Sequence, residues 1–182
     1  MNCTDQEIIK QVNNGETDRF AVLVKRYQQQ AYRLALSILR QTMDAEDAVS
    51  EAFVKAFTAL PKCRADTDFK SWFLKITYNC CQDTLRKRKN LLNIEPLVNS
   101  LETITLTENP AEKFENQEMK ETIWQAMAEL TAEERAAVIL KYYHDVSYQK
   151  ISVILQWPLG SVASRLSRAR DKLRIRLKGG TG

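Results

Sequence analysis

The sequence predicts an all-α protein made of two small helical domains joined by an extended acidic linker. Apolar residues recur at three- and four-residue spacing over most of the chain, as they do on one face of a helix. Only five Gly and four Pro occur among the 182 residues, which favours helices over a turn-rich β fold. The helical spacing fails in the middle, where residues 91–115 carry five acidic side chains and one basic side chain. We therefore expect domains at 1–90 and 114–182, with a linker at 91–113 that is longer than most connections within a domain.

The first domain is expected to begin with a short helix followed by a long one. Thr4 and Glu7 have the spacing of a capping box, in which each side chain bonds the backbone of the other residue at a helix start. A long helix is predicted from about Thr17 to Arg40. Its buried stripe is predicted to contain Phe20, Leu23, Val24, Tyr27, Ala31, Leu34, Ala35 and Ile38.

Two further helices complete the expected first domain. Asp44 is predicted to cap the third helix, and Pro61 to end it. The inward side of this helix should carry Ala48, Ala52, Phe53, Ala56, Phe57 and Leu60. A polar loop at residues 62–67 then leads to a fourth helix that starts near Asp68. It ends in the basic run Arg86–Lys89, where positive charge complements the helix dipole.

The second domain is predicted to be helical as well. A helix is expected at about residues 114–130, and Thr131 with Glu134 forms another capping box ahead of the next one. A short amphipathic helix at Tyr148–Leu155 is followed by a turn at residues 156–158 and by a basic helix. The basic side chains of this last helix are Arg165, Arg168, Arg170, Lys172, Arg174, Arg176 and Lys178. Two helices across a short turn, the second of them basic, are typical of a helix-turn-helix that reads DNA.

The last helix has one apolar face and one polar face. Val162, Leu166, Ala169 and Leu173 fall on the first face and are expected to pack on Ile151, Ile154 and Leu155. The other face would enter a major groove, with Ser164, Ser167 and Arg168 near base edges and with Arg165, Arg170 and Lys172 at phosphates on its flanks. The alternative is an amphipathic helix whose arginines are solvated or lie on a membrane surface.

Composition argues against several other classes of protein. With one His, and with Cys3, Cys63, Cys80 and Cys81 outside C-x-x-C spacing, we expect no metal site, no cofactor and no disulfide framework. No catalytic triad, phosphate-binding glycine loop or H-E-x-x-H motif is present, so we expect no catalytic residues and no enzyme activity. No apolar run approaches the roughly 20 residues of a membrane span, and the N-terminal residues are polar, so the expected location is the cytoplasm.

Three sequence blocks together resemble one bacterial family. The string PLGSVASRLSRARDKLR is similar to the pattern P-x-G-T-V-x-S-R-x-x-R-A-R-x-x-L of domain four of the extracytoplasmic-function (ECF) sigma factors of RNA polymerase. In the first domain, DAEDAVSEAFVKAF and FKSWFLKITYNCCQDTLRKRK resemble the family's D-A-E-D-x-x-Q-E-x-F and F-x-x-W-L-x-x-I-x-x-N-x-x-x-D-x-x-R-K segments. The blocks lie in the family order and cover most of the chain.

The resemblance implies a set of partners and roles. Residues 1–90 would be sigma domain 2, which binds the β′ clamp helices of core polymerase and melts the minus-10 promoter element, and 114–182 would be sigma domain 4, which reads the minus-35 element and meets the β flap. The implied minus-35 residues are Ser161, Ser164, Arg165, Ser167, Arg168, Arg170 and Lys172. The implied minus-10 residues are Lys62, Arg64, Asp66, Lys75, Asn79, Arg86, Lys87 and Arg88. The implied polymerase-binding residues are Asp44, Glu46, Asp47 and Glu51. An anti-sigma factor is expected as a regulator.

Some positions depart from the family pattern or allow a simpler interpretation. Ser161 replaces a commoner Thr, Ser50 stands where Gln is usual, and Cys63 stands where an aromatic residue is frequent. Asp44 has a local explanation as a helix cap, and Asn79 as an ordinary surface or packing amide. A plain helix-turn-helix repressor or activator would explain the second domain, but it would leave the blocks of the first domain and the acidic linker unexplained.

Overall fold

The computed structural model describes residues 3–63, 67–92 and 117–179, and every regular element in these ranges is a helix. The chain forms two compact units, Met1–Asn99 and Ser100–Gly182, which are called unit 1 and unit 2 below. The predicted all-α class is thereby confirmed for the described part of the chain. The predicted linker at 91–113 lies almost entirely outside the described residues.

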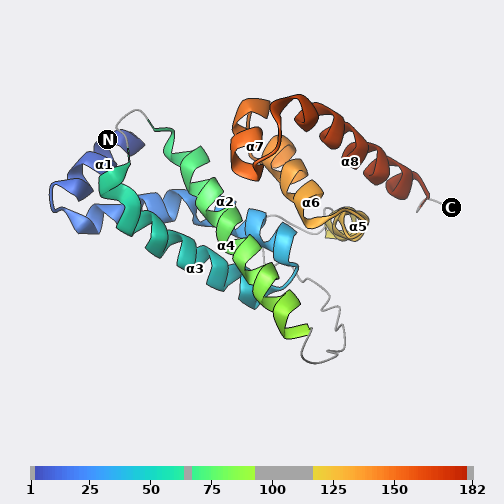
Figure 1. The fold of residues 1–182 in the computed structure, drawn as a ribbon, viewed down its shortest axis with the longest axis horizontal. Coiled ribbons are helices and arrows are strands. Elements are labelled where there is room, and N and C mark those ends of the chain that lie inside the picture. The colour runs from blue at the N-terminus through green and yellow to red at the C-terminus, as the bar shows by residue number, and fades with distance from the viewer. Residues whose placement is uncertain (1–2, 64–66, 93–116, 180–182) are drawn as a thin grey trace. The chain divides into compact units, whose positions relative to one another are not determined.

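Unit 1 is a bundle in which α2, α3 and α4 pack against one another and α1 packs on α2 (Figure 1). The bounds are α1 Asp5–Asn13, a 3₁₀ turn at Thr17–Arg19, α2 Phe20–Leu39, α3 Thr42–Ala59, a 3₁₀ turn at Leu60–Lys62, and α4 Phe69–Leu92. Packed aromatic rings occupy the centre of the bundle. Phe73 stacks on Phe53 and on Phe69, with ring centroids 4.4 and 5.8 Å apart, and Tyr27 lies 5.3 Å from Phe69.

The helix starts of unit 1 follow the sequence prediction in one case and depart from it in others. The capping box of Thr4 and Glu7 is present at the start of α1, and Gly15 supplies the positive φ, 104°, of the following turn. The long helix begins later than predicted, after the 3₁₀ turn at Thr17–Arg19. The prediction that Asp44 caps α3 is wrong, because Gln41 holds the extended cap position and Asp44 lies in the first turn.

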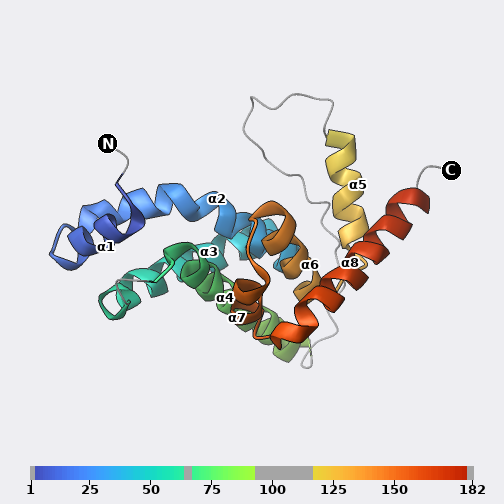
Figure 2. The same ribbon diagram turned by 90° about the horizontal axis from the view of Figure 1, so that it is seen from above.

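Unit 2 is built around α8. Its elements are α5 Gln117–Met127, α6 Ala132–Val138, a π-helical turn at Ile139–Tyr143, α7 Tyr148–Leu155 and α8 Leu159–Gly179. Helices α5, α6 and α7 all contact α8, and Figure 2 shows α5 and α6 beside it. The apolar face predicted for the last helix is confirmed, since Val162, Leu166 and Ala169 are buried and Leu173 packs against Leu130, Val138 and Ala169. Ile151, Ile154 and Leu155 of α7 are buried as predicted.

The tight turn between α7 and α8 has a defined geometry. Gln156 ends α7 in the left-handed conformation with φ 56°, which a side-chain-bearing residue adopts at a cost. The next residue is tied back to α7 in both directions: the Trp157 N–H donates to the Ser152 carbonyl at 3.0 Å, and the Ser152 hydroxyl donates to the Trp157 carbonyl at 2.6 Å. Pro158 then precedes the first turn of α8. These contacts fix the direction in which α8 leaves the turn.

Candidate nucleic-acid interface

The outward side of α8 carries the residues that the sequence predicts to contact DNA. Arg168 and Arg170 are exposed there, and the contacts they make are with serines of the same helix. Arg168 Nε lies 3.4 Å from the Ser164 carbonyl, and Arg170 Nη2 lies 3.5 Å from Ser167 Oγ. Both distances are at the limit of a hydrogen bond, so the guanidinium groups keep most of their donors available for another partner.

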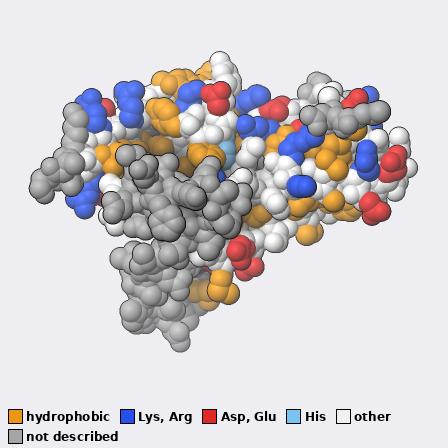
Figure 3. Space-filling view, turned by 180° about the vertical axis from the view of Figure 1, so that it is seen from behind, with side chains coloured by type: hydrophobic (Ala, Val, Ile, Leu, Met, Phe, Trp, Pro, Cys, Tyr) orange, Lys and Arg blue, Asp and Glu red, His pale blue; other side chains and the backbone are white. Residues whose placement is uncertain are grey.

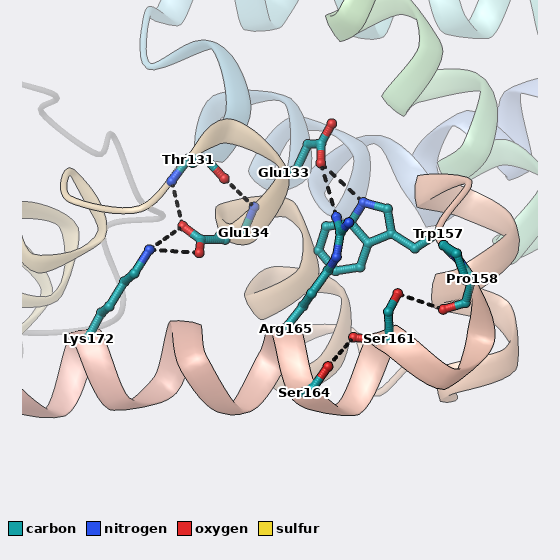
Figure 4. A network of polar contacts seen from close by, with 9 residues as sticks. All are labelled: Thr131, Glu133, Glu134, Trp157, Pro158, Ser161, Ser164, Arg165 and Lys172. Atoms are coloured by element: carbon teal, nitrogen blue, oxygen red, sulfur yellow. Dashed lines mark hydrogen bonds and ion pairs between the residues drawn. The ribbon is translucent and has the colours of Figure 1, made fainter.

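The serine hydroxyls near the start of α8 bond the helix itself. Ser161 Oγ donates to the Pro158 carbonyl at 2.8 Å, and Ser164 Oγ donates to the Ser161 carbonyl at 3.0 Å (Figure 4). Ser161 is half-buried and Ser164 is exposed. A hydroxyl that donates to a carbonyl still has lone pairs free, so these serines could accept a hydrogen bond from a base edge without losing the bond they make.

Arg165 is held between two side chains of unit 2. Its guanidinium carbon lies 4.5 Å from the centre of the Trp157 ring. Its Nη1 lies 3.6 Å from Glu133 Oε2, and the same carboxylate oxygen accepts a hydrogen bond from Trp157 Nε1 at 3.1 Å. Figure 4 shows how these three groups, from α6, the turn and α8, close on one another. Part of Arg165 remains exposed, so the group is accessible to a further ligand.

Lys172 forms a second link between α8 and the start of α6. Its Nζ donates to both carboxylate oxygens of Glu134, at 2.8 and 3.1 Å. Glu134 also accepts from the Thr131 N–H at 2.9 Å, within the predicted capping box, which is confirmed. Partial burial would raise the pKa of Glu134, but the hydrogen bonds from Lys172 and from Thr131 outweigh burial and lower it below its ordinary value.

In unit 1 the predicted minus-10 residues divide between two sides of α4. At 100° per residue, Lys75, Asn79 and Arg86 project within about 40° of one another. Asn79 and Arg86 are exposed and Lys75 is half-buried. Lys87, also exposed, projects about 120° away from Lys75. Lys62 is exposed at the end of its 3₁₀ turn, whereas the predicted site residues Arg64 and Asp66 lie outside the described residues.

Arg88 faces the opposite way, into the corner between α2 and α3. Its Nη1 donates to the Leu39 carbonyl at 3.0 Å, Nη2 contacts the Gln41 side chain, and the guanidinium forms an ion pair with Asp44. The pair is about two-thirds buried on each side. A predicted DNA residue and a predicted polymerase residue are therefore bonded to each other, and their evident role is to fix α4 against the start of α3.

The predicted acidic face of α3 is less uniform than the sequence indicates. Asp44, Asp47 and Glu51 share one side of the helix at spacings of three and four residues, and Glu46 projects away from them. Glu51 is paired with Lys55, with 2.7 Å between carboxylate and ammonium, and Lys55 also lies 3.6 Å from Asp83. Asp47 and Glu46 are exposed.

In Figure 3, Lys and Arg side chains of the described residues stand among acidic and hydrophobic side chains. Among the described residues, no group of three or more His, Cys, Asp or Glu side chains is arranged to hold a metal ion. None of the described helices is long and apolar enough to cross a membrane.

Sequence reasoning missed the residues that orient the basic side chains of α8. Glu133 and Trp157 were not candidates for the site, and Glu134 was predicted only as a cap. All three act on residues of α8 that are eight to 38 positions away, as in the Trp157–Arg165 stack and the Lys172–Glu134 bond. A Trp in a short turn before a basic helix was the one local signal that could have drawn attention to them.

Comparison with known proteins gives the same assignment for both units. Residues 23–91 match the family described as Sigma-70 region 2, and residues 120–173 match Sigma-70, region 4. The chain is 30% identical to the ECF RNA polymerase sigma factor SigW of Bacillus subtilis (strain 168) over 177 residues, which are 93% of this chain and 95% of that protein. It is 29% identical to the ECF RNA polymerase sigma-E factor of Escherichia coli (strain K12), over 93% of this chain and 92% of that protein.

Two solved structures share the fold. The sigma factor RpoE in complex with the anti-sigma factor NepR from Bartonella quintana superposes with a TM-score of 0.75, at 24% identity, over 87% of this chain and 96% of that one. CnrH in complex with the cytosolic domain of CnrY gives a TM-score of 0.67, at 22% identity, over 96% of this chain and 97% of that one.

Proposed function

Because the chain belongs to the family of ECF RNA polymerase sigma factors, we propose that it binds core RNA polymerase, recognises minus-35 and minus-10 promoter elements, melts promoter DNA and directs initiation at a specific set of genes. We place minus-10 recognition in residues 1–90, a linker in 91–113 and minus-35 recognition in 114–182. It acts in the cytoplasm by binding and positioning, without a chemical step of its own.

The observation that carries this proposal is the arrangement of α8. Its apolar face is fixed on α6 and α7, and its other face presents Arg168, Arg170 and the serine oxygens of Ser164 and Ser167 outward. A helix held in this way can lie in a major groove, where Arg reads guanine and Ser accepts or donates to several bases. Arg165, Arg170 and Lys172 then contact phosphates beside the groove, with Ser161 at the start of the helix, and these contacts set register and affinity.

Minus-10 recognition is proposed for the exposed side of α4 and the loop before it. Lys75, Asn79 and Arg86 form a polar and basic row, Lys87 is exposed on another side of α4, and Lys62 is exposed before the loop. Such a row suits a single DNA strand, whose phosphates need cations and whose unstacked bases need hydrogen-bonding groups. Arg64 and Asp66 belong to the same proposed site. Arg88 is the member with the weakest support, because its guanidinium is occupied within unit 1.

Polymerase binding is proposed for the acidic side of α3. Asp47 is an exposed acid on this side, suited to a basic partner surface such as the β′ clamp helices, and Glu51 and Asp44 contribute after loosening their bonds to Lys55 and Arg88. Glu46 is exposed as well but projects to another side of α3, so it has the weakest support of the four. We place the contact with the β flap in unit 2. The solved structure of RpoE is of a sigma factor in complex with the anti-sigma factor NepR, and this supports the proposal that an anti-sigma factor controls this chain too.

Run-off transcription with purified bacterial core polymerase tests the proposal, using a library of upstream DNA with and without the full chain. We expect initiation that depends on the chain and selects particular upstream sequences, which identify the promoter. No initiation, together with tight binding of the chain alone to paired half-sites in duplex DNA, would instead indicate a plain helix-turn-helix regulator.

A further inference from the structure

Trp157 gives the turn of unit 2 a rigid aromatic wall beside the DNA-facing helix. Its side chain is almost fully buried, at 6% exposure, and its backbone is bonded to Ser152 through both N–H and carbonyl. The ring therefore has little freedom to move. Arg165, eight residues later and two turns into α8, lies over this ring with its guanidinium carbon 4.5 Å from the ring centre. That distance is within the range of a cation–π contact, which is stronger for Trp than for other aromatic residues.

Glu133 completes the enclosure from the first turn of α6, where a carboxylate also interacts favourably with the helix dipole. It accepts from Trp157 Nε1 at 3.1 Å and faces Arg165 Nη1 at 3.6 Å. The second distance is too long for a hydrogen bond, so the ion pair restrains the guanidinium without using up its donors. With a side-chain exposure of 39%, Arg165 still presents donors to solvent.

We propose that Trp157 and Glu133 are positioning residues, which hold the Arg165 guanidinium in a preset orientation for a backbone phosphate of duplex DNA. This inference rests on the proposed function and adds to it the means by which unit 2 orients one phosphate contact. A long Arg side chain loses rotamer freedom when it binds, and a side chain already ordered in the free protein loses less. Trp157 therefore favours binding.

The two positioning residues affect affinity in opposite directions. Trp157 is uncharged, and it orders Arg165 without repelling DNA. Glu133 orders Arg165 as well, but its negative charge also opposes an approaching phosphate. Replacing Glu133 by Gln keeps an acceptor for Trp157 Nε1 and removes the repulsion. The 3.6 Å contact between Glu133 and Arg165 is too long for a hydrogen bond, so the repulsion of phosphate outweighs the restraint that Glu133 provides. The proposed role therefore gives the two substitutions opposite signs, whereas a purely structural role would make both harmful.

The test is a double-mutant cycle on the full chain, with short duplexes of random sequence as the DNA probe and fluorescence anisotropy as the readout. Trp157→Leu should weaken binding about 2- to 10-fold when Arg165 is present and less than about 2-fold in an Arg165→Ala background. Trp157→Phe retains a ring under the guanidinium and should bind within about 2-fold of the natural chain. Glu133→Gln should tighten binding about 2- to 5-fold.

Salt titration of the same complexes tests whether Arg165 contacts a phosphate. The slope of log affinity against log salt concentration should flatten by about 0.9 in Arg165→Ala, the change expected for one lost phosphate contact. The inference is overturned if Trp157→Leu weakens binding equally with and without Arg165, if Glu133→Gln weakens it, or if the slope in Arg165→Ala is unchanged.

A DNA-free measurement separates this inference from the proposed function. In the NMR spectrum of the free chain, the Arg165 side-chain resonances should be shifted upfield by the Trp157 ring, and the shift should disappear in Trp157→Leu and persist in Trp157→Phe. An absent shift overturns the positioning role even if the chain directs transcription. A normal shift with no DNA binding and no transcription overturns the proposed function, and with it the DNA role of Arg165.

Discussion

At the scale of single residues, the two acids in the first turn of α6 each form an ion pair with one basic side chain of α8. Glu133 faces Arg165 and Glu134 binds Lys172. Within the chain, these two carboxylates compete with the DNA phosphates that the same basic side chains are proposed to bind. The charge of the proposed DNA-binding surface is therefore set by pairs across two helices and cannot be obtained by counting the arginines and lysines of α8 alone.

The Lys172–Glu134 bond predicts a pH dependence that can be measured at one carboxyl group. Because the pKa of Glu134 is lowered in the folded chain, its bonds contribute stability that is fully present above its ordinary value of 4.5 and is lost as the pH falls through the lower folded pKa. Lys172→Ala should raise the pKa of Glu134 toward 4.5, as followed by carbon-13 NMR titration. Arg174→Ala removes the same charge from the same helix without removing this bond, and should change the pKa far less. Equal changes in the two variants would contradict the assignment.

Arg88 is predicted to stabilise the fold of unit 1, whether or not it also contacts DNA. Arg88→Ala removes a bond to the Leu39 carbonyl and leaves the partly buried Asp44 without its cation, so we expect a loss of about 1–2 kcal/mol in the free energy of unfolding of unit 1. Lys87→Ala, at an exposed neighbouring position, should change it by less than about 0.5 kcal/mol. Hydrogen exchange of the slowest amides of α2–α4 measures both values. Similar values for the two variants would refute the role given to Arg88.

At the scale of elements, the turn between α7 and α8 contains a conformation that its own sequence does not favour. Gln156 has a φ of 56° and is exposed, so its side chain gains little from packing to offset the left-handed backbone. Gln156→Gly should therefore stabilise unit 2 by about 0.5–1 kcal/mol. Gln149→Gly, at an exposed position in the first turn of α7, should destabilise it by less than about 1 kcal/mol. Hydrogen exchange of α7 and α8 amides measures the change in the stability of unit 2 for both variants. A loss of stability in Gln156→Gly would show that the turn needs the Gln side chain.

Periodicity and capping patterns predicted most elements of both units, because those signals are local. The helix at Tyr148–Leu155, the turn after it and the capping box at Thr131 were all obtained from neighbouring residues alone. The start of α3 was not predicted correctly. Arg40 ends α2 in the left-handed backbone conformation, and α3 then begins at Thr42 without a side-chain cap. Phe57 shows the same limit for burial: it lies at core spacing, yet 40% of it is exposed.

The candidate site was predicted less completely than the fold for a physical reason. Residue type and helical face can be deduced from spacing, so the outward position of Arg168 and Arg170 was predictable. Whether a charged side chain is available to bind an external partner depends on contacts with residues distant in sequence, as for Arg88 with Leu39 or Lys172 with Glu134. Only the packed structure brings such partners within bonding distance.

At the scale of the whole molecule, each unit has a core of its own, and this predicts separate responses to core substitutions. Leu34 is fully buried in unit 1 and Leu166 is 1% exposed in unit 2. Replacement of either by Ala should cost about 2–5 kcal/mol through lost burial and the cavity left behind. We expect Leu166→Ala to lower amide protection in α5–α8 while sparing α1–α4, and Leu34→Ala to do the reverse. Loss of protection in both units from either variant would show that the units fold as one.

The proposed function requires both units to act in one polymerase complex, so a change in unit 1 should abolish an activity that unit 2 alone cannot supply. Asp47 is exposed on the side of α3 proposed to meet the polymerase, and its replacement disturbs no bond of the core. Asp47→Lys should remove chain-dependent run-off transcription and weaken the affinity for core polymerase at least about tenfold, since a like charge then faces a basic surface. The fold and the affinity of the free chain for duplex DNA should stay unchanged.

Asp18→Lys is the matched control for this prediction, because it makes the same change of charge at an exposed position outside the proposed interfaces. Polymerase affinity measured for both variants then separates a local contact from the effect of net charge. If Asp18→Lys weakens binding as much as Asp47→Lys does, long-range electrostatics explains the loss. If neither variant weakens it, the polymerase does not bind the acidic side of α3, and the contact surface must lie on another part of the chain.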